Sequence, residues 1–259
     1  MASFVTCVHV HTGSGGMGLA QMVGGCAAAV QLAKDVNAVR QGGAGGVPID
    51  VIDIGGGLPV TWGRVNQSPS FEDYAAGIRE KVPELFDASV FRRVITEMGA
   101  AMNCKFAWLG SVVEVTKPRD GGQIAMIHAG SDIFMRQCYA SEMRKGHPIR
   151  CYDARGARKV QGVTSVDIAG PLCFAGDIVS PNTELPSLEV SDIVVLEEAG
   201  GNCLSMATSH CSRRRPPVYG YRMSGDDGAA ADGFGVADGF TFELISAGQS
   251  YDQTLSVWN

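Results

Sequence analysis

Strand-like apolar runs and helix-like segments alternate through the first hundred residues, and this alternation limits the possible folds more than any other feature. The runs "FVTCVHV", "IDVIDI" and "RRVITEMG" predict three strands, and apolar residues at helical spacing over 19–40 predict a long helix. Ser70 and Asp73 predict a capping box for a second helix through "FEDYAAGIREKVPELF". Strands that alternate with helices predict parallel β/α units, with functional loops at the carboxyl ends of the strands.

The pattern changes at about residue 104. Runs rich in β-branched residues follow one another between turn signals, and no long helical pattern separates them. This pattern predicts a mostly antiparallel sheet or barrel. The predicted fold class is therefore α/β plus all-β, with one domain over residues 1–103 and a β-domain over 104–259. The Gly-, Ala- and Asp-rich stretch 224–240 is expected to be a flexible surface insertion.

Composition narrows the class of partner. The chain has 259 residues, of which 45% are hydrophobic, so it can bury a core. The net charge of −6 and the absence of a basic stripe argue against nucleic acid, and "SRRRPP" at 212–217 is too short to change this. No apolar segment approaches the ~18 residues of a membrane span, and we expect no secretory signal.

The cysteines indicate a reducing compartment, for which we expect the cytoplasm. The sequence has eight of them and no C-x-x-C pair, and most lie inside apolar runs. Such spacing favours reduced, buried thiols over a disulfide framework or a zinc site, so we expect no metal.

Each of the three predicted parallel strands ends in a polar or glycine-rich group: "HVHTGSG", "DIGGGLP" and "TEMGA". These ends would place His11, Ser14, Gly55 to Gly57 and Glu97 around one pocket. A hydroxyl and glycine amides suit a phosphate, an imidazole can lie against a ring, and a carboxylate can bind a protonated ring nitrogen. Taken singly, each group is better explained by a turn, a core histidine or an ordinary strand end. Together they predict a pyridoxal phosphate site.

These motifs, in this order, resemble those of the fold-type III pyridoxal-phosphate decarboxylases that act on ornithine, arginine and meso-diaminopimelate, with the diaminopimelate type closest. The resemblance implies the C-terminal part of a cofactor-binding β/α (TIM-type) barrel followed by the family's β-domain. It implies that His11 stacks on the cofactor ring and that Ser14 and the glycines Gly55, Gly56 and Gly57 bind its phosphate. Glu97 would contact the pyridine nitrogen, with Gly99 beside it.

The resemblance continues through the second half. "DIAGPLCFAGDIV" resembles a Gly-Pro-x-Cys segment, which implies that Cys173 returns a proton to the substrate α-carbon in the neighbouring subunit's site. From the residues alone, Cys173 would be one more buried thiol. "HAGSDIFMRQCY" is similar to a segment whose arginine and tyrosine contact the substrate, here Arg136 and Tyr139. "EEAGGNCLSMATSHCSRRRPPVYGY" resembles the family's Gly-Ala-Tyr segment and the stretch after it.

Several positions depart from the family pattern. The family's Schiff-base lysine lies on an earlier barrel strand, and none of the lysines here has a similar context. Ala100 replaces a phosphate-binding arginine, and Asn202 replaces a tyrosine near the phosphate. Phe174 replaces an acidic residue that recognises the distal amine of the substrate.

These departures leave three hypotheses open. The first is a pyridoxal-phosphate-dependent decarboxylase of the diaminopimelate or ornithine type, truncated or catalytically impaired, acting on a small amino acid. The second is a non-catalytic relative that binds and regulates a full-length homologue. The third is an incomplete gene product with no stable function, which the sequence does not separate from the second. The resemblance implies a homodimer or a heterodimer with such a homologue.

Overall fold

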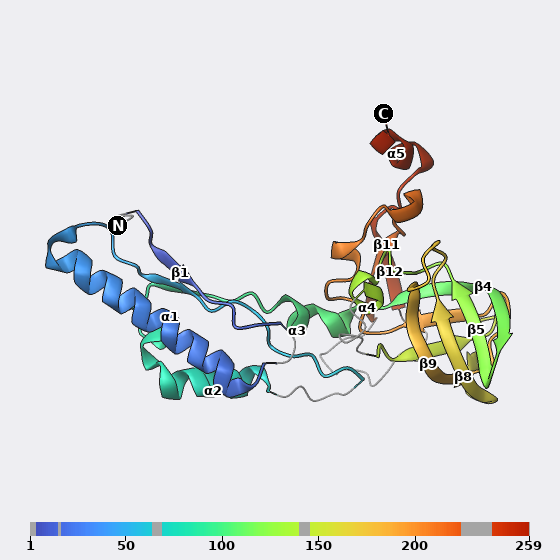
Figure 1. The fold of residues 1–259 in the computed structure, drawn as a ribbon, viewed down its shortest axis with the longest axis horizontal. Helices are drawn as coiled ribbons and strands as arrows, with labels where there is room; N and C mark the ends of the chain where they lie inside the picture. The colour runs from blue at the N-terminus through green and yellow to red at the C-terminus, as the bar shows by residue number, and fades with distance from the viewer. Residues whose placement is uncertain (1–3, 15–16, 64–68, 140–145, 224–239, 259) are drawn as a thin grey trace.

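A computed structural model describes residues 4–14, 17–63, 69–139, 146–223 and 240–258. The predicted insertion at 224–240 lies, except for Phe240, outside the described residues. Two regions follow one another along the long axis of the molecule: an α/β region that contains the first helices, and a β-sheet domain (Figure 1). The predicted change of structure near residue 104 is consistent with this arrangement.

The α/β region is built on a three-stranded parallel sheet in the order β1-β2-β3. Its strands are short, and two longer helices pack beside them (Figure 1). The elements are β1 (Cys7–His9), α1 (Leu19–Val39), β2 (Val51–Asp53), α2 (Phe71–Lys81) and β3 (Arg93–Ile95). The predicted order of strands and helices is confirmed, and all three strands point the same way.

The two helices begin where the sequence predicts and end differently. Ser70 Oγ accepts from the Asp73 amide and the Asp73 carboxylate accepts from the Ser70 amide, which confirms the capping box. The prediction that this helix runs through Phe86 was wrong, because the residue before Pro83 leaves the helical region and a 3₁₀-helix (Pro83–Phe86) follows. The first helix continues beyond Val39 as a π-helix (Arg40–Ala44).

The sheet domain contains a seven-stranded sheet in the order β7-β6-β10-β4-β5-β8-β9. All neighbours are antiparallel except β5 and β8, and β6 also approaches β9, which curls the sheet towards a barrel. Its core includes Val113, Val166, Ile168, Val194 and Leu196, all fully buried. The strands are β4 (Leu109–Arg119), β5 (Gly122–Ile127), β6 (Ile149–Tyr152), β7 (Arg158–Lys159), β8 (Val163–Ala169), β9 (Ile178–Pro186) and β10 (Ile193–Leu196).

Two strands of this sheet escaped the sequence prediction. The stretch that forms β9 contains Pro181 and Pro186 beside polar residues, and Asn182 has a φ of +47°. Proline cannot donate to a sheet ladder, but β9 lies at the edge of the sheet, where an unpaired position is tolerated. The other missed strand, β7, has two residues and lies at the opposite edge.

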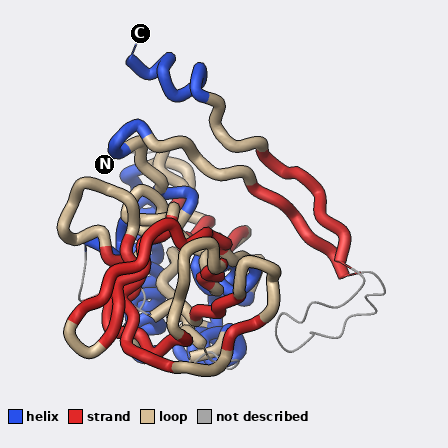
Figure 2. The backbone as a smooth tube through the Cα atoms, turned by 90° about the vertical axis from the view of Figure 1, so that its right-hand side faces the viewer, coloured by secondary structure: helices blue, strands red, loops and turns tan. Residues whose placement is uncertain are grey.

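A separate antiparallel ribbon of β11 (Val218–Met223) and β12 (Phe240–Ser246) projects from the sheet domain and leads to α5 (Tyr251–Leu255) (Figure 2). Two short helices, α3 (Gly99–Asn103) and α4 (Met135–Tyr139), lie at the start of the domain and after β5. Among the described residues, none of the helices combines the length and the apolar character that a membrane crossing requires.

Candidate functional site

A cavity of ≈ 240 Å³ lies where the loops after the three parallel strands meet the sheet domain. The α/β region contributes His11, Ser14, Gly56, Gly57, Leu58, Val60, Trp62, Glu97, Gly99 and Ala100 to its lining. The sheet domain contributes Cys104, Phe134, His147, Gly201, Asn202 and Cys203. The structure therefore brings together most of the residues predicted to contact the cofactor; Gly55 belongs to the same loop but does not line the cavity.

His11 and Ser14 follow β1 and contact each other. The Nε2 atom of His11 lies 3.1 Å from Ser14 Oγ, and its Nδ1 atom accepts a long hydrogen bond of 3.4 Å from the Gly56 amide. An Nδ1 atom that accepts leaves the proton of a neutral imidazole on Nε2, so Nε2 donates to Ser14. The serine hydroxyl hydrogen is then free to bind an anion in the cavity.

The glycine loop after β2 has a packing reason for its missing side chains. A Cβ atom on Gly55 would lie 2.4 Å from the Val10 carbonyl oxygen, and one on Gly56 would lie 2.3 Å from that of Glu97. Gly57 has a φ of +95°, and its Cβ would lie 2.0 Å from the Gly13 carbonyl oxygen. The backbones after β1 and β3 thus press directly against this loop, which only glycine allows.

Glu97 follows β3 and is tied to the same loop. Its amide donates to the Gly55 carbonyl at 2.8 Å, and its half-exposed carboxylate lies 3.6 Å from Nε2 of His9. The two residues at the start of α3 that follow it, Gly99 and Ala100, also line the cavity. Among the described residues, no lysine or arginine lines this cavity, so an anion there would depend on neutral donors and histidine.

The sheet domain adds side chains that the sequence analysis missed. His147 is buried in ring contact with Trp62 and Phe134, with centroids 4.7 and 5.3 Å away, and its Nδ1 lies 2.8 Å from the Glu197 carbonyl oxygen. Burial lowers the pKa of His147, although the bond to Glu197 opposes this. These residues lie in irregular segments without periodicity, so no sequence pattern marked them.

The predicted proton donor and substrate residues lie away from this cavity. Cys173, in the loop between β8 and β9, is exposed, which corrects the expectation of a buried thiol. Its Sγ atom lies 3.5 Å from that of Cys211, and this contact raises the pKa of Cys173. Tyr139 is also exposed and stacks on Phe174 at 4.9 Å. The side chain of Arg136 lies outside the described residues.

The remaining cysteines agree better with the expectation of reduced, buried thiols. None of the eight forms a disulfide bond, and five of them are buried: Cys26, Cys104, Cys138, Cys151 and Cys203. Burial raises the pKa of the Cys203 thiol to about 12 and that of Cys151 to about 11. These thiols are protonated and act as small apolar side chains.

A buried carboxylate holds the Cys173 loop in place. Asp177 accepts from the amides of Ser131 at 2.6 Å and Leu172 at 2.7 Å, and a Cβ on Gly170 or Gly130 would collide with it. The loop therefore wraps around a charge that is satisfied by backbone donors. The position of Cys173 is fixed by its neighbours, although its side chain is open to solvent.

Comparison with known families now decides the classification. A family model described as "Pyridoxal-dependent decarboxylase, C-terminal sheet domain" matches residues 51–200, more than half of the chain. The chain belongs to this family of pyridoxal-dependent decarboxylases. The match runs from β2 into the turn after β10 and includes the glycine loop, Glu97 and Cys173. The resemblance inferred from the motifs is confirmed.

The relatives of this family member include diaminopimelate decarboxylases. The enzyme of Methanocaldococcus jannaschii is 28% identical over 171 residues, which cover 66% of this chain and 37% of that protein. That of Helicobacter pylori strain J99 is 27% identical over 206 residues, covering 80% of this chain and 46% of the relative. The chain thus spans less than half the length of these relatives.

Solved structures of the same family share the fold. Diaminopimelate decarboxylase from Helicobacter pylori, complexed with L-lysine, superposes with a TM-score of 0.74 at 21% identity, over 98% of this chain and 55% of that chain. Lysine/ornithine decarboxylase from Vibrio vulnificus, complexed with cadaverine, gives a TM-score of 0.62 at 21% identity, over 78% of this chain and 50% of that chain. An α/β region followed by a sheet domain is therefore the shared architecture, while assignment to a TIM-type barrel and the boundary at residue 103 stay predictions.

Proposed function

We propose that this chain provides the cofactor-contacting loops and the sheet domain of a pyridoxal-phosphate-dependent amino-acid decarboxylase of the diaminopimelate type. The observation that supports this proposal is the gathering of His11, Ser14, the glycine loop and Glu97 around one cavity, at the carboxyl ends of parallel strands. Loops at this edge of a parallel sheet are the usual place for ligands in α/β folds.

The cavity fits the cofactor by the types of group that line it. The Ser14 hydroxyl and the Gly57 amide suit a phosphate, with Gly56 beside them and its amide on His11 Nδ1, and the His11 imidazole can lie against a ring. The Glu97 carboxylate would keep a proton on the pyridine nitrogen. When bound, pyridoxal phosphate supplies a protonated ring that takes up the electron pair left by carbon dioxide. Ala100 in the lining removes a bidentate cationic contact, so we expect weak retention of the phosphate.

Cys173 is the proposed proton donor to the substrate α-carbon. A donor must carry its proton at working pH, and the contact with Cys211 raises the Cys173 pKa, which keeps the thiol protonated. Because Cys173 lies outside the lining of this cavity, the proposal is that it acts on the cavity of a second subunit. Arg136 and Tyr139 would contact the amino-acid substrate there.

Equilibrium dialysis with pyridoxal phosphate tests the cofactor proposal, with inorganic phosphate as competitor. Replacement of Ser14 by Ala should weaken binding about fivefold, as expected for a hydrogen bond of about 1 kcal/mol. Glu97→Gln should weaken it about tenfold, because a charge-assisted bond is lost. Glu114→Gln is the matched control, since Glu114 is equally exposed and also pairs with a histidine, His128.

Equal binding by the Glu97→Gln and Glu114→Gln variants would contradict the assignment of Glu97. Carbon dioxide release from meso-diaminopimelate, lysine and ornithine then identifies the substrate. The proposal for activity of this chain by itself is wrong if the chain binds the cofactor but releases no carbon dioxide from any of the three.

A specific observation supports the alternative of a non-catalytic, regulatory partner. Within the described parts of the chain, no lysine lines the cavity. Lys105 directly follows the lining residue Cys104, but its ammonium group is paired with Glu198 at 2.8 Å. A full-length diaminopimelate-type decarboxylase mixed with this chain would then change in activity without turnover by the chain itself. An unchanged rate and separate elution of the two proteins would exclude this alternative.

The ribbon and the last helix support association with a second subunit. Tyr219, Phe242, Leu244 and Ile245 on β11 and β12 are more than half exposed, as are Tyr251 and Leu255 on α5. Several exposed apolar side chains on one projecting element are consistent with an interface. We propose that a second copy, or a full-length homologue, covers them. Sedimentation of the full chain should show a dimer, and Phe242→Asp should shift it to a monomer.

A further inference from the structure

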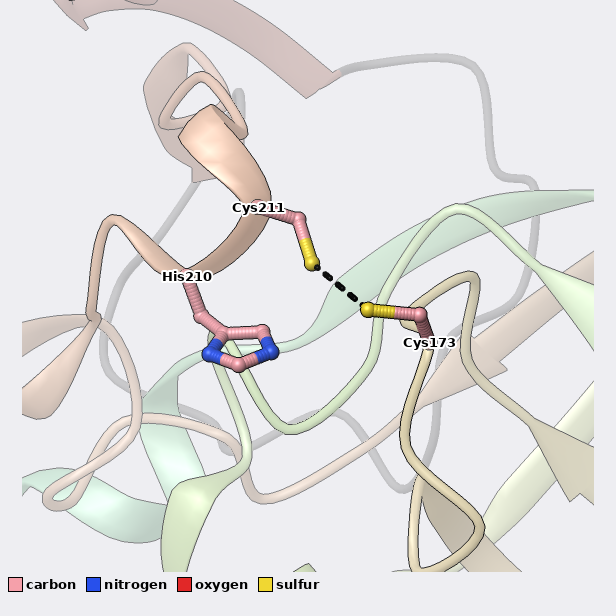
Figure 3. Close-up of side chains that lie close together, drawn as sticks. All are labelled: Cys173, His210 and Cys211. Carbon is pink, nitrogen blue, oxygen red and sulfur yellow. Dashed lines mark hydrogen bonds between the residues drawn. The ribbon is translucent and has the colours of Figure 1, made fainter.

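Three metal-ligating side chains meet on the surface of the sheet domain, outside the lining of the cavity. Cys173 comes from the loop between β8 and β9, and His210 and Cys211 come from a 3₁₀-helix (His210–Ser212) that precedes the ribbon. Their ligand atoms all lie within 4.8 Å of one another, and Figure 3 shows both sulfur atoms and the imidazole facing a common space. Two thiols and an imidazole form a coherent donor set.

Both loops are fastened to the same buried turn at residues 130–132. Asp177, which holds the Cys173 loop, accepts from the Ser131 amide at 2.6 Å. On the other side, Arg213 Nε donates to the buried Asp132 carboxylate at 3.0 Å, and the Thr208 amide donates to the Asp132 carbonyl oxygen at 2.9 Å. One turn therefore sets the distance between the two ligand-bearing segments. The cluster is built by the fold and does not arise from a chance approach of two mobile loops.

The geometry suits a tetrahedral metal ion. With Zn–S bonds of about 2.3 Å, two thiolates at tetrahedral corners lie about 3.8 Å apart. The two Sγ atoms here are separated by 3.5 Å, which is close to that edge and far longer than the ~2.05 Å of a disulfide bond. Soft thiolates with one imidazole favour Zn²⁺ over hard cations such as Mg²⁺ or Ca²⁺.

We propose that Cys173, Cys211 and His210 form a site for Zn²⁺ or a similar thiophilic divalent cation, with a fourth position open to water. The two thiols lose their protons to solvent on binding, so the two thiolates neutralise the charge of the ion. This proposal departs from the sequence expectation of no metal, which rested on the absence of a C-x-x-C pair: Cys173 and the His210–Cys211 pair come from segments far apart in the sequence. The site does not depend on the cofactor or on the proposed decarboxylase activity.

Binding at this site has a consequence for the thiol that the proposed function uses. A thiolate held by a metal ion has no proton to give and cannot swing towards a substrate. Zn²⁺ would therefore inhibit any reaction that needs a proton from Cys173. Removal of Cys211 would abolish this inhibition while it leaves Cys173 in place.

Titration of the full chain with Co²⁺ under a phosphine reductant tests the proposal. Tetrahedral Co²⁺ with thiolate ligands gives an intense charge-transfer band and visible d–d bands, and Zn²⁺ should displace the ion and remove them. We expect saturation at one ion per chain. Cys173→Ser, Cys211→Ser and His210→Ala should each weaken binding by at least about tenfold, because loss of even an outer-shell partner of a metal ligand costs about 10–100-fold.

The matched controls are Cys7→Ser, a cysteine outside the cluster, and His128→Ala, an exposed histidine in the sheet domain. Both should bind Co²⁺ as the unaltered chain does. The three ligand positions are exposed, so their variants should fold, which far-ultraviolet circular dichroism checks. Absence of the charge-transfer band in the reduced chain, or its persistence in the Cys211→Ser variant, would overturn the proposal.

Pyridoxal phosphate binding distinguishes this proposal from the proposed function. The Cys211→Ser variant should lose Co²⁺ binding and keep its affinity for the cofactor, because Cys211 does not line the cavity. The Glu97→Gln variant should bind the cofactor more weakly and bind Co²⁺ as the unaltered chain does. Failure of one of the two proposals therefore leaves the other measurable.

Discussion

The buried cores of the two regions are formed by different kinds of element. In the α/β region, the strands have three residues each, and the buried core comes mainly from α1, α2 and the segments around β2. In the sheet domain, the strands are up to eleven residues long and provide most of the buried side chains themselves. The first region therefore holds its functional loops through close backbone contacts, while the second holds them on a packed sheet.

The largest difference in stability between the two regions should appear when one buried or partly buried strand side chain in each is shortened to alanine. Ile168 in β8 is completely buried, whereas Val94 in β3 is 37% exposed. Ile168→Ala should lower the free energy of unfolding by about 2–5 kcal/mol, because it leaves a cavity in the core. Val94→Ala should cost less than about 0.5 kcal/mol. Urea unfolding followed by circular dichroism measures both, and equal losses would contradict the comparison.

A smaller but more local effect should follow from a methyl group in the glycine loop. Gly57→Ala adds a Cβ at a φ of +95° against the Gly13 carbonyl oxygen, so it should cost about 1–3 kcal/mol and displace Ser14. At Gly99 the added Cβ meets nothing within 4 Å, so Gly99→Ala is the control for stability. The same urea experiment checks the cost, and equal stability of the two variants would show that backbone contact does not hold this loop.

The hydrogen bond between α1 and α2 should contribute less to the free energy of unfolding than the close packing of the glycine loop. The Tyr74 hydroxyl on α2 lies 3.0 Å from Cys26 Sγ on α1, and both groups are buried. Tyr74→Phe should cost about 0.5–1.5 kcal/mol, as for a typical buried hydrogen bond. Tyr219→Phe, at an exposed position of β11, is the control. A loss in the control as large as that in Tyr74→Phe would assign the effect to removal of a hydroxyl group in general and not to the bond with Cys26.

The smallest expected change in stability is the one caused by acid, and it concerns an ion pair between the residues that precede β2 and β3. Arg92, before β3, pairs at 2.8 Å with Asp50, before β2, and this hydrogen bond lowers the Asp50 pKa. A carboxyl whose pKa is lowered by folding stabilises the fold above its unfolded pKa of about 3.9, and this contribution disappears as the pH falls through the folded value.

The Asp50→Asn variant should therefore be less stable than the unaltered chain at pH 7 and equally stable near pH 2. Arg92 is exposed and Asp50 is only partly buried, so the difference at neutral pH should be small and should shrink in high salt. Urea midpoints of the two proteins as a function of pH provide the measurement. A constant difference across the pH range would show that the pair does not titrate as described.

The sequence predicts those parts of the fold that local patterns specify. The capping box at Ser70 and the apolar spacing of α1 depend on neighbouring residues only, and both are found. In contrast, β9 carries two prolines, and its status as a strand depends on its place at the sheet edge, which local sequence does not encode. The end of α2 is a different case, because Pro83 is a local signal, and the prediction gave more weight to the apolar pattern that continues to Phe86.

The residues of the candidate site also fall into those that the sequence predicts and those that it does not. His11, Ser14 and Glu97 follow predicted parallel strands, so strand order alone brings them to one edge. His147 and Trp62 reach the cavity from irregular segments, and their positions depend on how the sheet domain packs against the loops. The roles of Cys173, Arg136 and Tyr139 stay predictions, and the nearness of Cys211 to Cys173 could not be read from residues that lie far apart in the chain.

The single parallel pair of the sheet, β5 with β8, also bears on how this domain can change during evolution. Parallel neighbours need a connection that returns to the starting end of the sheet. Between β5 and β8, the described residues include α4, β6 and β7, and they place Phe134 and His147 at the cavity and Tyr139 at the surface. Substitutions at Phe134 or His147 can change the lining of the cavity while the pairing of β5 and β8 stays the same. New specificity can thus arise without a new fold.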